Sequence, residues 1–207
     1  MKNFIALIIS VLLILLLLFG YSTAVSSDLS QSIVRLHVIA NSDSEEDQAL
    51  KLKVRDALLA HSKSDFTEKA DIESKLSTYK EIAEKTIREN GYNYIAEAEY
   101  GNFRFPTKYY NNIALPAGQY DAVRIKIGSA KGKNWWCVMF PPLCFVDGTT
   151  DTAYAETKLE EYLDKESYDI ITSYRSGSFP FEIKFKIVEF FGRLSGKDKI
   201  YKTAGKD

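Results

Sequence analysis

An unbroken apolar run opens the chain, and amphipathic helical and strand patterns follow it. Residues 4–19 are apolar apart from Ser10. The run has 16 residues, fewer than the roughly 18 to 20 that usually span a bilayer. Lys2 precedes the run, and the small residues Ser22 and Ala24 follow it. This arrangement is typical of an export signal cleaved after Ala24, and an uncleaved N-terminal anchor is the alternative.

The next segment changes from small polar residues to a strand and then to a helix. Residues 25–32 predict a short tether, and the β-branched run 33–40 predicts a strand. Ser42 with Glu45 three residues later forms a capping box, so a helix is expected to begin there. Its apolar stripe predicts that the helix continues to about Ser62.

A second, longer amphipathic helix is predicted from Asp65 to a stop at Asn90 and Gly91. Strand patterns then replace helical ones. Residues 134–140 are apolar on both faces, which predicts a central, fully buried strand that ends at Pro141. Strands are also predicted at 94–100 and 120–127, and helices at 156–165 and 187–194. Residues 104–110 contain Pro106, so they are expected to be irregular or an edge strand.

Together these elements predict an α+β fold. We expect two N-terminal amphipathic helices packed on a mostly antiparallel sheet, with a further short C-terminal helix. The expected organisation is a signal or anchor at 1–24, a tether at 25–32, a single domain at 33–195 and a polar tail at 196–207.

Composition supports a folded domain and excludes some partners. The chain is 45% hydrophobic, with 13 Tyr and 12 Phe, which favours a real core over disorder. Without Lys2, 26 basic residues face 28 acidic ones, so the exported part carries about −2. This balance gives no electrostatic reason to bind nucleic acid or an anionic membrane, so membrane contact is expected only through the N-terminal segment.

Candidate catalytic and metal-binding groups are few. His37 lies in a strand pattern and His61 on an apolar helix face, and no Gly-x-Ser-x-Gly elbow is present. Structural histidines are therefore the better interpretation. The acidic cluster 43–47 lacks the spacing of a calcium loop, and helix-start electrostatics explains it. We expect no cofactor, no small-molecule substrate and no enzyme activity.

The two cysteines, Cys137 and Cys144, flank the double proline at 141–142. The turn between them can bring the two thiols together, and a disulfide is permitted outside the cytoplasm. Two free buried thiols and a reactive thiol are the alternatives. Four aromatic residues could bind sugar or peptide, although core packing is favoured for the tryptophans: Tyr109, Tyr110, Trp135 and Trp136.

Two longer motifs resemble a known family. They are RLHVIANSDSEEDQ at 35–48 and NWWCVMFPPLCF at 134–145, with FPTKY at 105–109 and PAG at 116–118 between them. Together they closely resemble stage II sporulation protein R of endospore-forming Firmicutes over about residues 33–146. The sequence departs from some members by lacking a long charged C-terminal extension.

The resemblance implies a signalling protein rather than an enzyme. Members are made in the forespore and exported into the space between the forespore and mother-cell membranes. There they trigger a membrane-embedded aspartic protease, stage II sporulation protein GA, which processes the sigma-E precursor.

We expect two receptor-contact surfaces, for which scaffolding is the alternative in each case. The first surface is the loop and helix start 41–47, with the contact residues Asn41, Asp43, Glu45 and Asp47. The second is the aromatic region 105–110 beside the segment 135–144, with the contact residues Phe105, Lys108, Tyr109, Trp135 and Trp136. The rival functional classes are a secreted hydrolase acting on cell wall or peptide and a membrane-anchored structural protein of the spore envelope.

Overall fold

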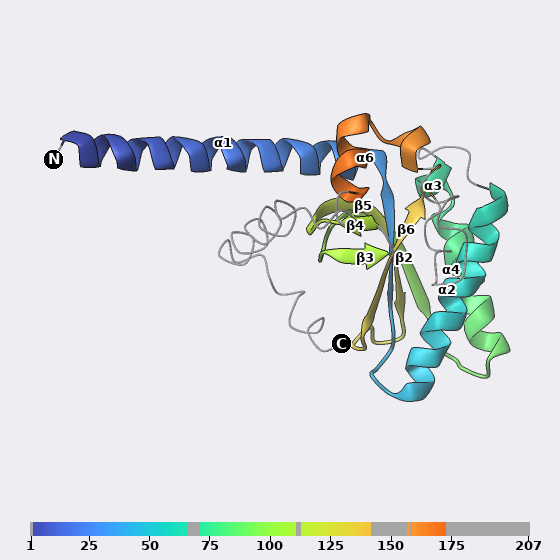
Figure 1. The fold of residues 1–207 in the computed structure, drawn as a ribbon. Coiled ribbons are helices and arrows are strands. Elements are labelled where there is room, and N and C mark those ends of the chain that lie inside the picture. Colours follow the sequence, from blue (N-terminus) through green and yellow to red (C-terminus); the bar gives the residue numbers. More distant parts are fainter. Residues whose placement is uncertain (1, 66–70, 111–112, 142–156, 158, 173–207) are drawn as a thin grey trace.

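The computed structural model in Figure 1 describes residues 2–65, 71–110, 113–141, 157 and 159–172. The helices and strands within these ranges are α1 (Lys2–Ser32), β1 (Val34–Ile39), α2 (Glu45–Asp65), α3 (Asp71–Ser74), α4 (Leu76–Glu89), β2 (Ala96–Phe105), β3 (Lys108–Tyr110), β4 (Ile113–Leu115), β5 (Gly118–Ile127), β6 (Asn134–Phe140) and α6 (Lys165–Thr172). The predicted helix at 187–194 lies outside the described residues.

The N-terminal segment forms one long helix, α1, which projects from the domain (Figure 1). Residues 25–32 continue this helix instead of forming the predicted tether. Leu29 is fully buried in an apolar cluster of the domain, so the end of α1 is packed rather than free. Among the helices of the described residues, none has the length and apolar content needed to cross a membrane.

The main sheet is mixed, so the prediction of a mostly antiparallel sheet is wrong. Its strand order is β2–β5–β1–β6. β1 is parallel to β5, with Arg35 opposite Ala122, and antiparallel to β6. β2 is antiparallel to β5. The parallel pair arises because α2 to α4 and β2 lie between β1 and β5 in the chain. β5 then enters between β1 and β2, and periodicity alone does not reveal such an order.

The two predicted helices also differ from expectation. They are not the first in the chain, because α1 precedes them. α2 continues to Asp65, where the second helix was expected to start, and that second helix is present as α3 and α4. The predicted stop at Asn90 and Gly91 is confirmed. Gly91 has φ +84°, its N–H bonds to the Arg88 carbonyl, and the N–H of Tyr92 bonds to the Ile87 carbonyl.

An apolar cluster packs against each face of the main sheet. Helices α2 and α4 cover one face, where apolar residues of β1, β5 and β6 form the larger cluster. The β3–β4 hairpin, the end of α1 and α6 contribute to a second cluster on the other face. β6 has the predicted bounds and is buried on both faces, yet it is the last strand in the order rather than a central one. The two clusters explain its burial.

Candidate functional site

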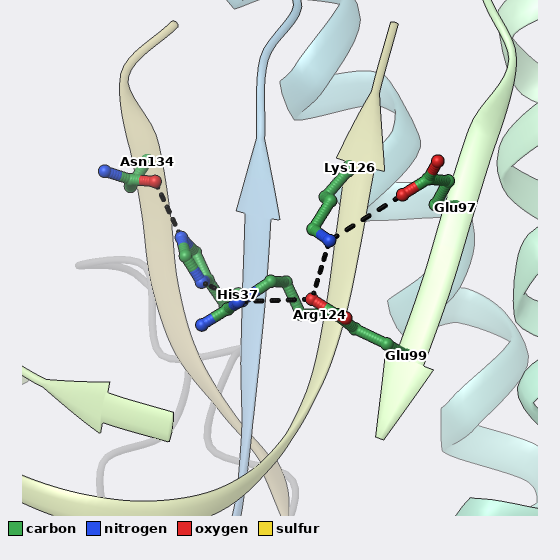
Figure 2. A network of polar contacts seen from close by, with 6 residues as sticks. All are labelled: His37, Glu97, Glu99, Arg124, Lys126 and Asn134. Atoms are coloured by element: carbon green, nitrogen blue, oxygen red, sulfur yellow. Dashed lines mark hydrogen bonds and ion pairs between the residues drawn. The ribbon is translucent and has the colours of Figure 1, made fainter. Parts of the chain in front are cut away.

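Figure 2 shows a network of polar side chains on the sheet face opposite α2 and α4. All four strands of the main sheet contribute to it, and alternation along each strand brings these side chains to one face. The residues are His37 of β1, Glu97 and Glu99 of β2, Arg124 and Lys126 of β5, and Asn134 of β6.

His37 is the buried centre of this network, with an exposed fraction of 1%. Its Nε2 lies 2.7 Å from the Asn134 Oδ1, and the Arg124 Nε donates to its Nδ1 at 3.2 Å. Since Arg124 can only donate, Nδ1 must accept and Nε2 must carry the proton. The ring also stacks on Trp136, with 3.8 Å between centroids. His37 is therefore held as one neutral tautomer.

Burial is the main cause that lowers the pKa of His37, which falls to about 3. The positive charges of Arg124, Arg35 and Lys126 lower the pKa further, and the hydrogen bond to Asn134 opposes them. A neutral imidazole with both nitrogens occupied is poorly suited to act as a general base at neutral pH. The geometry thus fits the structural interpretation of His37.

The outer part of the network consists of ion pairs between strands β2 and β5. Arg124 Nη1 and Lys126 Nζ lie 3.1 Å and 3.0 Å from the same Glu99 oxygen, and Lys126 is 3.7 Å from Glu97. The Arg124 guanidinium also lies 3.6 Å from the ring centroid of Phe103. Burial lowers the pKa of Arg124 despite the opposing charge of Glu99. The two carboxylates offset the charges of Arg124 and Lys126, so this network of ion pairs carries little net charge.

Arg35 lies two residues before His37 on the same face of β1 and is fully buried. Its Nε donates to the Cys137 carbonyl at 2.9 Å, and its Nη2 donates to the Tyr110 hydroxyl at 3.1 Å. The guanidinium lies over the rings of Phe105 and Tyr120, at 4.4 Å and 5.1 Å from their centroids. We did not predict roles for Arg35 or Arg124, although Arg35 and His37 at i and i+2 of an apolar strand share one face.

The loop between β1 and α2 is held mainly by its own side chains. The N-cap of α2 is Ser44, whose hydroxyl accepts the Asp47 N–H at 3.2 Å, and not Ser42 as predicted. The Asp47 carboxylate instead accepts hydrogen bonds from Asn41 and Ser42. Burial alone would raise the pKa of Asp47. Hydrogen bonds, chiefly from Ser42 and Asn41, outweigh burial and lower it.

This loop is also hydrogen-bonded to the connection between β5 and β6. The Asn41 side-chain oxygen accepts the Ser129 N–H at 2.9 Å, and the Asp43 carboxylate accepts the Lys133 N–H at 2.6 Å. A Cβ on Gly128 would collide with the Asn41 side chain, and one on Gly132 would collide with the backbone of Ser42. Asn41, Asp43 and Asp47 therefore have structural partners in addition to any role in binding.

The structure places the expected contact residues in separate parts of the domain. Asp43 and Glu45 are exposed at the foot of the sheet, where the chain leaves β1 (Figure 1). Tyr109 is 50% exposed on β3, a separate part of the domain, and Lys108 beside it is half-buried.

The remaining aromatic contact candidates belong largely to the interior. Phe105 is fully buried and Trp136 is 7% exposed, which favours core packing. Trp135 is half-buried beneath the guanidinium of Arg55, whose carbon lies 4.2 Å from the ring centroid. Neither tryptophan forms an open platform on which a sugar or peptide could stack.

The predicted cysteine pair and cleavage site stay predictions. Cys137 is buried in β6, whereas Cys144 lies outside the described residues. Ala24 lies within α1. Within the part of the chain that the structure describes, no group of three or more His, Cys, Asp or Glu residues could hold a metal ion.

Comparison with known proteins gives two matches. The family described as stage II sporulation protein R matches residues 30–150. A protein named stage II sporulation protein R, from Bacillus subtilis (strain 168), is 39% identical over 145 residues. That alignment covers 67% of this chain and 65% of the relative, so the chain spans about two thirds of the relative's length. No solved structure matches the chain.

Proposed function

Because the chain belongs to the stage II sporulation protein R family, we propose that it is an exported activator of a membrane-embedded aspartic protease in sporulation. The protease is stage II sporulation protein GA, and its product is mature sigma-E. The single observation that carries this proposal is the family match, which spans the strands and helices of the domain from the end of α1 to β6.

The contacts around His37 support a non-catalytic role. The imidazole is neutral, stacked and bonded at both nitrogens, and the neighbouring acids are paired with Arg124 and Lys126. A protein that activates by binding needs no reactive group. It needs only a higher affinity for the active state of its receptor than for the inactive state.

The N-terminal run supports delivery of the domain across a membrane. Residues 4–19 act as the export signal, cleaved after Ala24 or retained as an anchor. The domain then works in the space between the forespore and mother-cell membranes, and only the N-terminal segment contacts lipid. There it binds the extracytoplasmic face of the protease.

Co-expression in a non-sporulating host tests this function. The full chain, the protease and the sigma-E precursor are produced together, and processing of the precursor is followed by immunoblot. Processing should require this chain and should be lost when residues 4–19 are deleted. Processing without the chain would falsify the proposal, as would a lack of processing when this chain is exported and all three proteins are folded.

The acidic start of α2 can be tested in the same host. Reversing the charge of Glu45 and Glu46 should reduce processing if this exposed surface contacts the protease. Asp43 and Asp47 are left intact because their carboxylates hold the loop. Reversal of Lys85 and Arg88, which are exposed on α4, is the matched control. Unchanged processing in a folded Glu45 and Glu46 variant removes this surface from the proposal.

The disulfide between Cys137 and Cys144 is part of the proposal, because export places both thiols in an oxidising compartment. It would stabilise the turn after β6 by about 2–4 kcal/mol. Mass spectrometry of the exported chain, alkylated with and without prior reduction, decides the matter. Two alkylated thiols before reduction would exclude the bond.

A further inference from the structure

A continuous helix, rather than a flexible linker, joins the export signal to the domain. α1 runs from Lys2 to Ser32 and β1 begins at Val34, so only Ile33 lies between the helix and the first strand. Figure 1 shows the helix entering the domain beside α6. The predicted cleavage site after Ala24 therefore lies inside α1, ahead of the part that contacts the domain.

Two apolar side chains anchor the end of this helix. Leu29 and Ile33 are both fully buried, and both belong to the second apolar cluster. The end of α1 contacts β5 and α6, whose buried residues belong to the same cluster. Undocking the last turns of α1 would expose both side chains to water, so these turns are held as part of the domain.

Cleavage requires a different conformation of the residues around Ala24. Ser22 and Ala24 form the small-x-small pattern that a signal peptidase recognises. In an extended chain, side chains two positions apart lie on the same side, so both can enter one binding site. In a helix, positions two apart lie on different sides of the axis. A peptidase that binds both small residues must therefore unwind α1 around Ala24.

The cleavage site and the anchor are too close together to open independently. Leu29 lies five residues after Ala24, which is between one and two helical turns. Unwinding around Ala24 leaves a short helical remnant before β1, and a helix that short is unstable on its own. Opening of the cleavage site in the folded protein is thus coupled to the loss of the packing of Leu29.

We infer that cleavage after Ala24 takes place only before the domain folds, and that the docked end of α1 makes a folded, uncut chain resistant to the peptidase. This inference rests on the proposed function, because it concerns the export step. It turns the order of two events into the choice between two forms. A chain cut before folding is released, whereas a chain that folds first keeps α1 and stays at the membrane.

The time at which peptidase is added tests the inference. The full chain is made by cell-free synthesis in the presence of detergent micelles, and signal peptidase is present either from the start or only after synthesis and folding. Early addition should cut most chains after Ala24. Late addition should cut them about tenfold more slowly or less, because only a rare open state of the folded chain is a substrate. Gel electrophoresis measures both rates, and equal rates overturn the inference.

Leu29→Ser tests the anchor, because it removes the apolar contact and leaves the cleavage site unchanged. On late addition this variant should be cut about tenfold faster than the wild type. The matched control is Leu58→Ala, because Leu58 is fully buried in the cluster on the other face of the sheet. The control destabilises the domain without loosening α1, so it should be cut more slowly than Leu29→Ser. Equal acceleration of the two variants overturns the inference, because the site then opens only by unfolding of the whole domain.

A flexible Gly/Ser linker inserted after Ser27 provides a second test that keeps every buried side chain. The folded linker chain should be cut readily on late addition, and its resistance would overturn the inference even if Leu29→Ser failed to fold. A wild-type chain that stays uncut on early addition also overturns the inference. That result leaves the proposed activation of the protease standing, because activation is measured separately in the co-expression host.

Discussion

Two neighbouring polar residues of β1 respond to burial in opposite ways. His37 is neutral when buried, because deprotonating an imidazole near neutral pH costs little free energy. Arg35 keeps its charge, because a guanidinium is not deprotonated in proteins, and aromatic rings and a carbonyl surround it instead. The same face of β1 therefore carries one imidazole that stays neutral and one guanidinium that stays charged.

His37 makes the domain sensitive to mild acid. The pKa of His37 is about 3 in the folded state and about 6.5 when unfolded, so only the unfolded chain takes up this proton between those values. Stability is therefore lost as pH falls. Between about pH 7.5 and pH 5 this single group should lower the free energy of unfolding by about 2 kcal/mol. Urea unfolding at both pH values measures the loss.

His37→Gln is the matched variant, because it removes the titration and keeps a polar side chain. The variant should be less stable than the wild type at neutral pH and should lose about 2 kcal/mol less on acidification. An equal loss in both proteins would contradict the assignment to His37.

Substitutions of Asp47 and Glu45 should change the free energy of unfolding by different amounts, although both residues belong to one acidic cluster. Asp47→Ala removes the acceptor for Asn41 and Ser42 and should lower the free energy of unfolding by about 2–3 kcal/mol. Glu45→Ala removes an exposed charge at the helix start and should cost less than about 1 kcal/mol. Denaturant unfolding of the two variants compares them directly, and similar losses would argue against the loop contacts.

At the scale of elements, two loops fix the order of the strands. The β5–β6 connection passes beside the end of β1, where Asn41 and Asp43 accept hydrogen bonds from Ser129 and Lys133. This contact lets β5 and β6 lie on opposite sides of β1. The glycine at 128 has φ +56° and allows the close approach.

Substituting Gly128 should test this contact between the two loops. Gly128→Ala places a Cβ against the Asn41 side chain at a positive φ, and should cost more than about 2 kcal/mol of stability. Gly91→Ala is the control, because Gly91 also has a positive φ but no atom within 4 Å of the added Cβ, and should cost about 1 kcal/mol. Thermal unfolding compares the two, and equal shifts would show that the Asn41 contact is unimportant.

Local patterns predicted elements well and their arrangement poorly. The strand at 134–140 and the helix stop at Gly91 depend on neighbouring residues, and both are present as expected. The parallel pairing of β1 with β5 depends on contacts between segments far apart in the chain, which periodicity does not encode. The cap at Ser44 was missed because two serines, at 42 and 44, precede the same acidic turn.

At the scale of the whole molecule, the domain has two apolar clusters, one on each face of the sheet. The first lies under α2 and α4. The second cluster includes Leu29 of α1. Leu29 belongs to the segment that follows the predicted cleavage site. Cleavage after Ala24 would therefore leave a helical end that completes the domain.

Truncation tests whether residues 25–32 belong to the fold. A chain beginning at residue 33 should lose about 2–3 kcal/mol of unfolding free energy relative to one beginning at residue 25, because Leu29 leaves the core. Leu29→Ala in the longer chain should reproduce most of the loss. Chemical denaturation measures all three proteins, and equal stability of the two truncated chains would show that the end of α1 is dispensable.

The position of β1 also determines when the domain can form. β1 emerges first among the strands, yet its neighbours come much later: Arg124 lies 87 residues after His37, and Cys137 lies 102 residues after Arg35. Such long-range pairing requires closure of large loops and slows folding. A chain translocated N-terminus first would thus stay unfolded until nearly the whole domain has crossed. If the chain is exported as proposed, slow and late folding would keep it unfolded for as long as its passage through a membrane pore requires.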